Sequence, residues 1–139
     1  MAINIDINSK RFFQVRNARN TEIAEDYTEM IADLINENGE ARSVDLAERF
    51  GVTSPTVNSI IRRLVREGLV ESKPYRSIFL TEEGKVLASF CKKRHEIVYK
   101  FLLAIGVKDD IARIDAEGLE HHVSKETLKV FENFILKNK

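Results

Sequence analysis

The chain has 139 residues, of which 43% are hydrophobic and 32% charged, with 2 prolines, 6 glycines and 1 cysteine. This length excludes a large enzyme, and the composition excludes a disordered, collagenous or disulfide-rich chain. Lysine and arginine balance aspartate and glutamate at 22 each, so net charge gives no argument for a polyanionic partner. The sequence contains neither a membrane-length apolar run nor a signal-peptide pattern, which predicts a cytoplasmic protein with no membrane partner.

The first strongly periodic segment predicts a helix over 21–37. Its apolar residues recur at steps of three and four, which is the spacing of one helix face. Thr21 is suited to the N-cap position, and Gly39 follows as a stop.

The next two segments predict a helix-turn-helix. A short helix is expected over 43–50, closed by the turn at 51–53. Ser54, as a capping residue, and Pro55, at the first helical position, then open a helix that runs to about residue 67. Helix, tight glycine turn and helix in this order are the layout of this motif.

Two short β-like runs, 69–72 and 77–81, come next and predict a hairpin. A hairpin directly after the second helix of a helix-turn-helix makes a winged helix. Thr81 is expected to cap a long helix that ends near residue 105, and two more helices are expected over about 108–122 and, capped by Ser124, 125–137.

The predicted fold class is therefore mainly α. A winged helix-turn-helix of three helices plus a β-hairpin wing, with an N-terminal extension, is expected over 1–81, and an all-α dimerisation domain over 82–139. The second part carries more apolar residues than so small a unit covers alone, which favours a homodimer.

Basic residues gather in two islands, at 10–19 and 54–76. In a helix-turn-helix the second helix presents its solvent face to the major groove of DNA, and a wing lies over the backbone or the minor groove. Three arginines on a helix would by themselves indicate only an ordinary solvated face. The turn, the Ser-Pro cap and the hairpin around them favour DNA binding. The candidate DNA-binding residues are Ser54, Pro55, Thr56, Asn58, Ser59, Arg62, Arg63, Arg66, Lys73, Tyr75 and Arg76.

All three histidines lie in the second part. On a helix, Glu117, Glu120 and His121 share one face, which makes either a ligand set for a divalent cation or an ordinary polar surface. His122 points away from them and is expected to be a packed or interface histidine.

Three more residues lie beside apolar stripes. His95 is at the edge of its helix's stripe, where a half-buried imidazole needs a partner. Asp26 and Glu29 flank the stripe of the first helix, and enclosed acids need a counter-charge, which a metal ion would supply.

Several strings carry a resemblance to the manganese-responsive transcriptional regulators of the diphtheria-toxin-repressor family, in their short bacterial form. They are E-D-Y-T-E-M at 25–30, S-P-T-V at 54–57, L-T-E-E-G at 80–84, R-H-E at 94–96 and, most specific, D-A-E-G-L-E-H-H-V-S at 115–124. The resemblance runs from about residue 22 to the C-terminus.

The resemblance implies a site for two Mn²⁺ ions per subunit, held by Asp26, Glu29, His95, Glu117, Glu120 and His121. Oxygen-rich ligation suits this hard ion. Iron-type relatives carry methionine where this chain has Asp26, which favours Mn²⁺ over Fe²⁺. The longer relatives append an SH3-like domain, for which this chain has no room.

The predicted function is a repressor that binds a palindromic double-stranded operator when loaded with Mn²⁺ and controls manganese uptake genes. An iron-responsive repressor of the same family and a metal-independent winged-helix regulator are the alternatives. A metal-dependent hydrolase is disfavoured, because the sequence offers neither a glycine-rich phosphate loop nor a nucleophile beside a base. No small-molecule substrate is expected.

Overall fold

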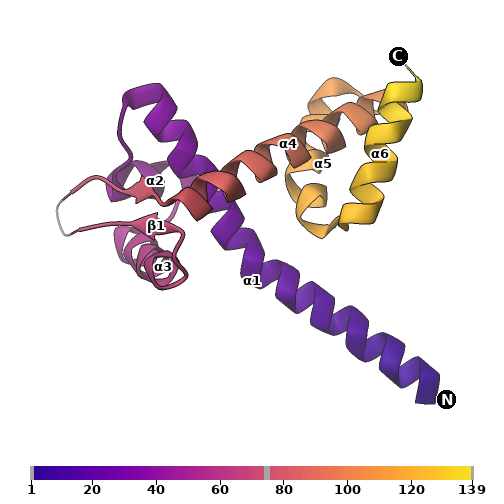
Figure 1. Cartoon of the computed structure of the whole chain (residues 1–139), viewed down its shortest axis with the longest axis horizontal. Helices are drawn as coiled ribbons and strands as arrows, with labels where there is room; N and C mark the ends of the chain where they lie inside the picture. The colour runs from indigo at the N-terminus through magenta and orange to yellow at the C-terminus, as the bar shows by residue number, and fades with distance from the viewer. Residues whose placement is uncertain (1, 74–75, 139) are drawn as a thin grey trace. The chain divides into compact units, whose positions relative to one another are not determined.

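The computed structural model describes the backbone of residues 2–73 and 76–138, and the side chains of 9–11, 21–73 and 76–138. The chain forms two compact units, one made of Ile23–Cys91 and the other of Met1–Glu22 together with Lys92–Lys139. The mainly helical fold with a small hairpin confirms the predicted fold class (Figure 1).

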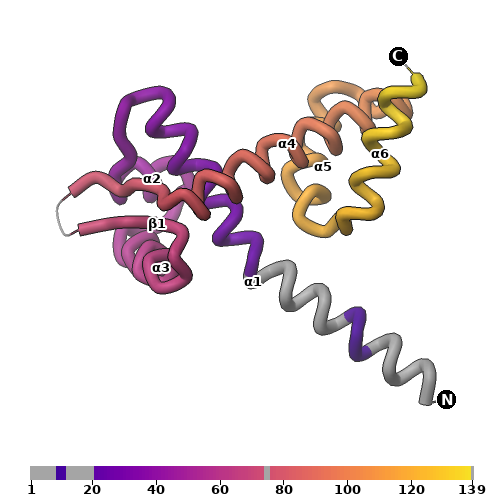
Figure 2. The backbone as a smooth tube through the Cα atoms, viewed as in Figure 1, coloured from indigo at the N-terminus to yellow at the C-terminus, as the bar shows by residue number. Residues whose placement is uncertain are grey.

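Helix α1 spans Ala2–Asn38, so the prediction that it begins after an N-cap at Thr21 is wrong. Figure 2 traces the part of α1 from residue 21 to its end in colour. Residues 2–20 contain neither proline nor glycine, and no residue type there stops helix propagation. The predicted end is confirmed. Gly39 has a φ of 81°, and its N–H donates to the carbonyl of Ile35 at 2.8 Å.

Helices α2 (Ser43–Phe50) and α3 (Ser54–Arg66) form the predicted helix-turn-helix. Gly51 lies between them with a φ of 67°, a left-handed conformation that glycine adopts without steric cost. The N-cap of α3 is Thr53 and not Ser54, because the Thr53 hydroxyl accepts from the N–H of Thr56 at 3.3 Å.

The predicted wing is present as two antiparallel strands, β1 (Val70–Glu71) and β2 (Phe79–Leu80). Helix α4 (Glu82–Ala104) follows at once, with the Thr81 hydroxyl accepting from the N–H of Gly84 at 3.1 Å, as expected of a cap. A Cβ at Gly84 would lie 2.1 Å from the carbonyl oxygen of Leu69. The start of α4 therefore packs so closely against the residue before β1 that only glycine, which has no Cβ, fits at position 84.

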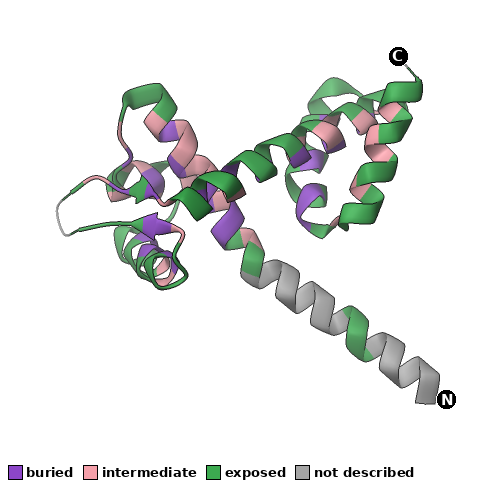
Figure 3. Cartoon of the chain, in the orientation of Figure 1, coloured by how far each residue is buried: buried purple, intermediate pink, exposed green. Residues whose placement is uncertain are grey.

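The core of the unit Ile23–Cys91 is continuous across its elements (Figure 3). Tyr27, Ile31 and Leu34 on α1 are each no more than 5% exposed, so this part of α1 is an integral element of the winged helix. The other buried apolar residues are Ala24, Ala41, Leu46, Val57, Ile61, Leu64, Val70, Ile78, Leu80 and Ala88.

The C-terminal unit contains the end of α4, then α5 (Asp109–Leu119), a 3₁₀ turn (Glu120–His122) and α6 (Lys125–Lys137). Ser124 caps α6 as predicted, accepting from the N–H of Thr127 at 3.1 Å. The expected helix over 108–122 is shorter, because its last three residues tighten into the 3₁₀ turn. Within the described residues, we find no helix long and apolar enough to cross a membrane.

The core of this second unit is small. Val98, Leu102, Ala112 and Ala116 form its buried cluster, with Phe101 stacked on Phe131 at 3.8 Å between ring centroids. Helix α6 contains no buried residue. The large apolar side chains that stay exposed among the described residues of this unit are Leu103, Ile105, Ile111, Ile114, Leu119, Val130, Phe134 and Leu136.

Candidate functional site

A cluster of imidazole and carboxylate groups lies where α4 faces the end of α5. The Nδ1 atom of His95 lies 2.8 Å from Oε2 of Glu120 and 3.8 Å from Oε1 of Glu117. One ligand atom from each of these residues lies within 4.8 Å of the other two, a spacing that one cation could bridge. The structure thus brings together three of the six predicted metal ligands.

Glu120 is enclosed and lies at the start of the 3₁₀ turn. Glu120 is 1% exposed, whereas Glu117, in the last turn of α5, is exposed. The Oε1 atom of Glu120 also lies 3.5 Å from Nε2 of the buried His121, which is a fourth predicted ligand. Glu117, Glu120 and His121 were predicted to share one face of an α-helix, but α5 ends at Leu119, and the buried Glu120 and His121 belong to the tighter 3₁₀ turn.

This donor set fits a divalent cation. A carboxylate as enclosed as that of Glu120 is costly without positive charge or hydrogen bonds around it. His95 and His121 supply two neutral nitrogen donors, and the two glutamates supply anionic oxygens, which are the ligands of hard or intermediate divalent metals. His95 is half-buried with a carboxylate partner, as predicted.

The side chain of Arg94 adds a fixed positive charge beside this cluster. Arg94 is 7% exposed, and its Nη2 lies 3.1 Å from Nδ1 of His121. The sequence analysis missed this residue, although its position directly before His95 on α4 was visible.

The two remaining predicted ligands lie on α1. Asp26 and Glu29 are three residues apart on one side of this helix, and both are half-buried. They belong to the unit Ile23–Cys91, whereas the other four predicted ligands belong to the C-terminal unit.

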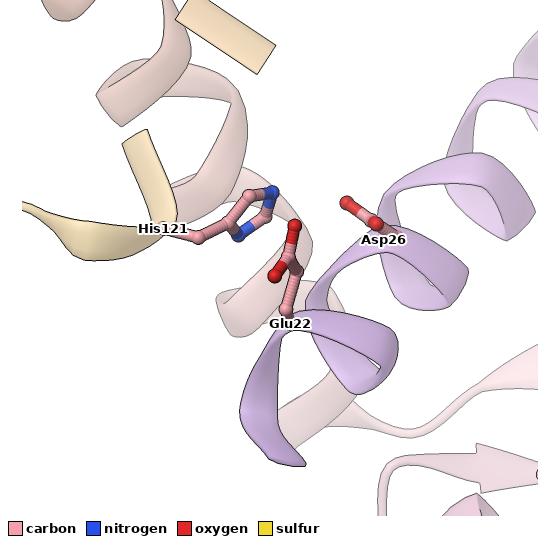
Figure 4. Close-up of side chains that lie close together, drawn as sticks. All are labelled: Glu22, Asp26 and His121. Carbon is pink, nitrogen blue, oxygen red and sulfur yellow. The ribbon is translucent and has the colours of Figure 1, made fainter. Parts of the chain in front are cut away.

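Glu22 is a further carboxylate that the sequence analysis missed. It precedes Asp26 by one helical turn, and its carboxylate lies within 4.8 Å of a ring nitrogen of His121 (Figure 4). The spacing of four residues from Asp26 was the available signal. His122, in contrast, is exposed and not packed in the chain, so only its predicted interface role stays open.

A basic hollow of about 960 Å³ lies among α2, α3 and the wing. Five cationic side chains contribute to it, and no acid is found among the described residues that line it. These cations are Arg42, Arg62, Arg66, Lys73 and Arg76. A concave surface of one charge sign concentrates anions such as phosphates.

The predicted DNA-binding residues of α3 differ in their surroundings. Ser54, Pro55, Thr56, Asn58 and Ser59 are exposed, and Asn58 also lines the hollow. Arg63 differs from its neighbours, because its Nε donates to Glu67 at 2.8 Å within the helix. Tyr75 lies outside the described residues.

Arg42 is a lining residue that the sequence analysis missed, since it precedes α2 and not the recognition helix. Its Nε donates to Glu40 at 3.1 Å, and Glu40 also accepts from the Ser77 hydroxyl at 2.8 Å. The hydrogen bond from Ser77, followed by the effects of Arg42, holds the pKa of Glu40 below its usual range. Glu40 is thus an anionic link from the end of α1 to the wing.

Two family models match consecutive parts of the chain. The model described as "Iron dependent repressor, N-terminal DNA binding domain" matches residues 20–78. The model described as "Iron dependent repressor, metal binding and dimerisation domain" matches residues 81–139.

Curated relatives and solved structures give the same family. The chain is 51% identical to the transcriptional regulator MntR of Escherichia coli O6:H1 over 136 residues, which cover 98% of the chain and 88% of the relative. It is 38% identical to the HTH-type transcriptional regulator MntR of Bacillus subtilis over 100 residues, 72% of the chain and 70% of that relative.

A structure titled "Manganese-dependent transcriptional repressor complex with manganese" matches with a TM-score of 0.71 at 29% identity, covering 81% of the chain and 52% of that structure. The manganese regulator SloR matches with a TM-score of 0.71 at 28% identity, covering 84% and 54%. The chain thus spans about half the length of these two structures. By the two family models and these identities, the chain belongs to the iron-dependent repressor family, the diphtheria-toxin-repressor family, as a transcriptional regulator of the MntR type.

Proposed function

We propose that this chain is a dimeric repressor that binds operator DNA when Mn²⁺ occupies its ligand cluster, and that it controls manganese uptake genes. The observation that carries the proposal is the buried Glu120 carboxylate, held beside His95, His121 and Glu117. The manganese-dependent repressor among the similar structures supports the choice of metal.

The proposed ligand set is Asp26, Glu29, His95, Glu117, Glu120 and His121, with two Mn²⁺ ions per subunit. Four carboxylates and two imidazoles favour a hard divalent ion over one that prefers sulfur ligands. Bound cations would supply the positive charge that allows these acids to stand close together.

The chain's own residues would convert ligation into DNA affinity. Asp26 and Glu29 lie on the same stretch of α1 as Tyr27, Ile31 and Leu34, which are packed into the winged-helix core. Fixing these two acids would therefore fix the orientation of α3. A palindromic operator presents its half-sites about one helical turn apart, so a dimer with two fixed reading heads binds it more tightly.

On the DNA side, we propose that α3 enters the major groove and that the basic hollow receives phosphates. The polar first turn of α3 suits base edges, while Arg62, Arg66 and the wing cations Lys73 and Arg76 suit the backbone. Arg42 joins them as a phosphate contact, because it lines the same hollow.

The first test measures operator affinity by fluorescence anisotropy, with no metal, with Mn²⁺ and, anaerobically, with Fe²⁺. The operator is first selected from random duplexes by the Mn²⁺-loaded protein. We expect Mn²⁺ to tighten binding at least tenfold, and His95→Ala and Glu120→Ala to abolish this gain while leaving the dimer intact. Operator binding that ignores metal would establish the metal-independent regulator instead.

Metal identity and stoichiometry have their own tests. Bound manganese per subunit is counted by elemental analysis of the purified protein, and two ions are expected. Asp26→Met should weaken the selectivity for Mn²⁺ and favour the response to Fe²⁺. An unchanged metal ranking would show that Asp26 does not select the metal. Glu22→Gln is measured beside it, to decide whether this carboxylate contributes to affinity.

The DNA contacts are tested through salt dependence. Each lost phosphate contact lowers the slope of log affinity against log salt by about one unit. We expect this for Arg62→Ala, Arg66→Ala, Arg76→Ala and Arg42→Ala. Arg49→Ala is the matched control, because Arg49 lies at the other end of α2 and pairs with Glu37 at 2.6 Å.

A further inference from the structure

We propose that Arg94 competes with the metal cation for His121, and so raises the cation concentration at which the ligand cluster fills. This inference rests on the proposed function, since it takes His121 to be a metal ligand. It assigns to Arg94 a role in setting the sensing threshold, distinct from the ligand roles of its neighbours.

The contact between the two side chains is an interior one. Arg94 is 7% exposed and His121 is 9% exposed, and Nη2 of Arg94 lies 3.1 Å from Nδ1 of His121. Because little water reaches these groups, their hydrogen bond is screened much less than a surface ion pair. The hydrogen bond between Arg94 and this ring is therefore stronger than the same contact would be at the surface.

The donor and acceptor inventory makes this contact incompatible with ligation. A guanidinium has only N–H donors, so Nδ1 of His121 must be the acceptor. A neutral imidazole has one such lone pair, and a metal ion needs the same one. If the cation takes Nδ1, it displaces Arg94 from that atom. If the cation takes Nε2, the ring proton moves to Nδ1, and two N–H groups then face each other.

The positive charge of Arg94 also opposes metal binding, as its use of the His121 lone pair does. The Nε2 atom of His121 lies 3.5 Å from Oε1 of Glu120, a carboxylate that is 1% exposed. The guanidinium bonded to the other side of this ring places positive charge near that carboxylate in the metal-free chain. Arg94 thus stabilises the metal-free arrangement and repels an incoming cation.

The deciding experiment measures Mn²⁺ affinity directly, by competition with a metal-sensitive fluorescent chelator, for the full-length wild type and Arg94→Met. Methionine keeps an unbranched apolar stem in place of the arginine side chain but removes the guanidinium, with its charge and its donors. We expect Arg94→Met to bind Mn²⁺ about tenfold more tightly, as losing a charged hydrogen bond of roughly 1.4 kcal/mol implies.

Arg113→Met is the matched control, since it removes the same charge from the same unit. Arg113 is exposed, bonds to Asp109 at 3.0 Å and lies over the ring of Tyr99 at 4.9 Å from its centroid. Its Mn²⁺ affinity should stay within about twofold of the wild type. An equal gain in both variants would overturn the competition, because net charge alone would then explain it.

A metal-free readout tests the hydrogen bond itself. Long-range nitrogen–proton NMR correlations of His121 should show an unprotonated, hydrogen-bonded Nδ1 and a protonated Nε2 in the wild type. In Arg94→Met the Nδ1 resonance should move to the position of a nitrogen without a donor. A wild-type ring with its proton on Nδ1 would overturn the proposal without any measurement on loaded protein.

The possible failures are distinguishable. If the wild type binds no Mn²⁺, the proposed function fails. If it binds Mn²⁺, but a folded Arg94→Met binds no more tightly, the role of Arg94 fails while the proposed function stands. Should Arg94→Met not fold, Arg94→Gln replaces it, for which we expect a smaller gain of about threefold because the amide can still donate to Nδ1.

Discussion

The two units of this regulator bury their apolar residues to very different extents. Within the described residues, 13 buried apolar side chains form the core of Ile23–Cys91, whereas the C-terminal unit has only Val98, Leu102, Ala112 and Ala116. In α6, Val130 and Leu136 are 59% and 61% exposed. The winged helix is thus stabilised by its own contacts, while the helical unit displays the apolar surface that a dimerisation domain covers with a second copy.

The largest expected effect comes from the core of the winged helix. Leu64 on α3 is 0% exposed, so Leu64→Ala should lower the free energy of unfolding by about 3 kcal/mol through lost burial and a residual cavity. Thermal and urea unfolding followed by circular dichroism measures this loss. A value below about 1 kcal/mol would contradict the view that this core stands alone.

The second prediction concerns the exposed face of the helical unit. Val130→Glu and Leu136→Glu should each weaken dimer formation by about 2 kcal/mol or more, because each would place a charge on the apolar surface that we expect a second copy to cover. Analytical ultracentrifugation measures the dimer dissociation constant. Lys93→Glu is the control, as Lys93 is an exposed polar residue of α4 in the same unit. Equal dimer affinity in all three variants would show that this face is not the interface.

The two units also differ in how closely the backbone packs around a helical glycine. Gly84→Ala should destabilise the chain by roughly 1–3 kcal/mol, because the added Cβ would lie 2.1 Å from the Leu69 carbonyl oxygen. Gly118→Ala should instead be neutral or stabilise it by up to about 1 kcal/mol, since nothing lies within 4 Å and alanine favours the helix. Unfolding of the metal-free variants measures both, and a reversed order would contradict the close packing of α4 on the wing.

The smallest effect concerns the surface of the helical unit at low pH. Asp109 accepts hydrogen bonds from Tyr99 and, at 3.0 Å, from Arg113, and these bonds hold the pKa of Asp109 below its usual range. A depressed folded-state pKa contributes stability above the unfolded-state pKa, and this contribution disappears as the pH falls through the folded-state value. Asp109→Asn should therefore be less stable than the wild type at pH 7, with the gap closing below about pH 4. A gap that stays constant between pH 7 and pH 3 would exclude this linkage.

Local patterns in the sequence were enough to predict most of the helices and the wing. The start of α2, the end of α1 at Gly39 and the cap of α6 at Ser124 depend on residues close in the chain, so a short window contains their cause. The predicted start of α1 was wrong, because a residue suited to capping, such as Thr21, does not mark the beginning of a helix when nothing before it breaks the helix.

The site was predicted less completely. His95, Glu117, Glu120 and His121 carried recognisable side-chain chemistry, and the structure brings them together. Arg42 carried only positive charge in a sequence with 22 cationic side chains, and Arg94 added to this only its place directly before His95, so neither was predicted to belong to a site.

Residue types at short spacing were enough to predict the order of helices, the hairpin and the set of side chains able to ligate a hard cation, because periodicity, caps and ligand chemistry are local properties. The packed fold was needed to learn that Glu120 is enclosed, that Arg94 is bonded to His121 and that five cations share one hollow. These features depend on contacts between residues far apart in the chain. The burial of such residues and the distances between them are set only when the elements pack.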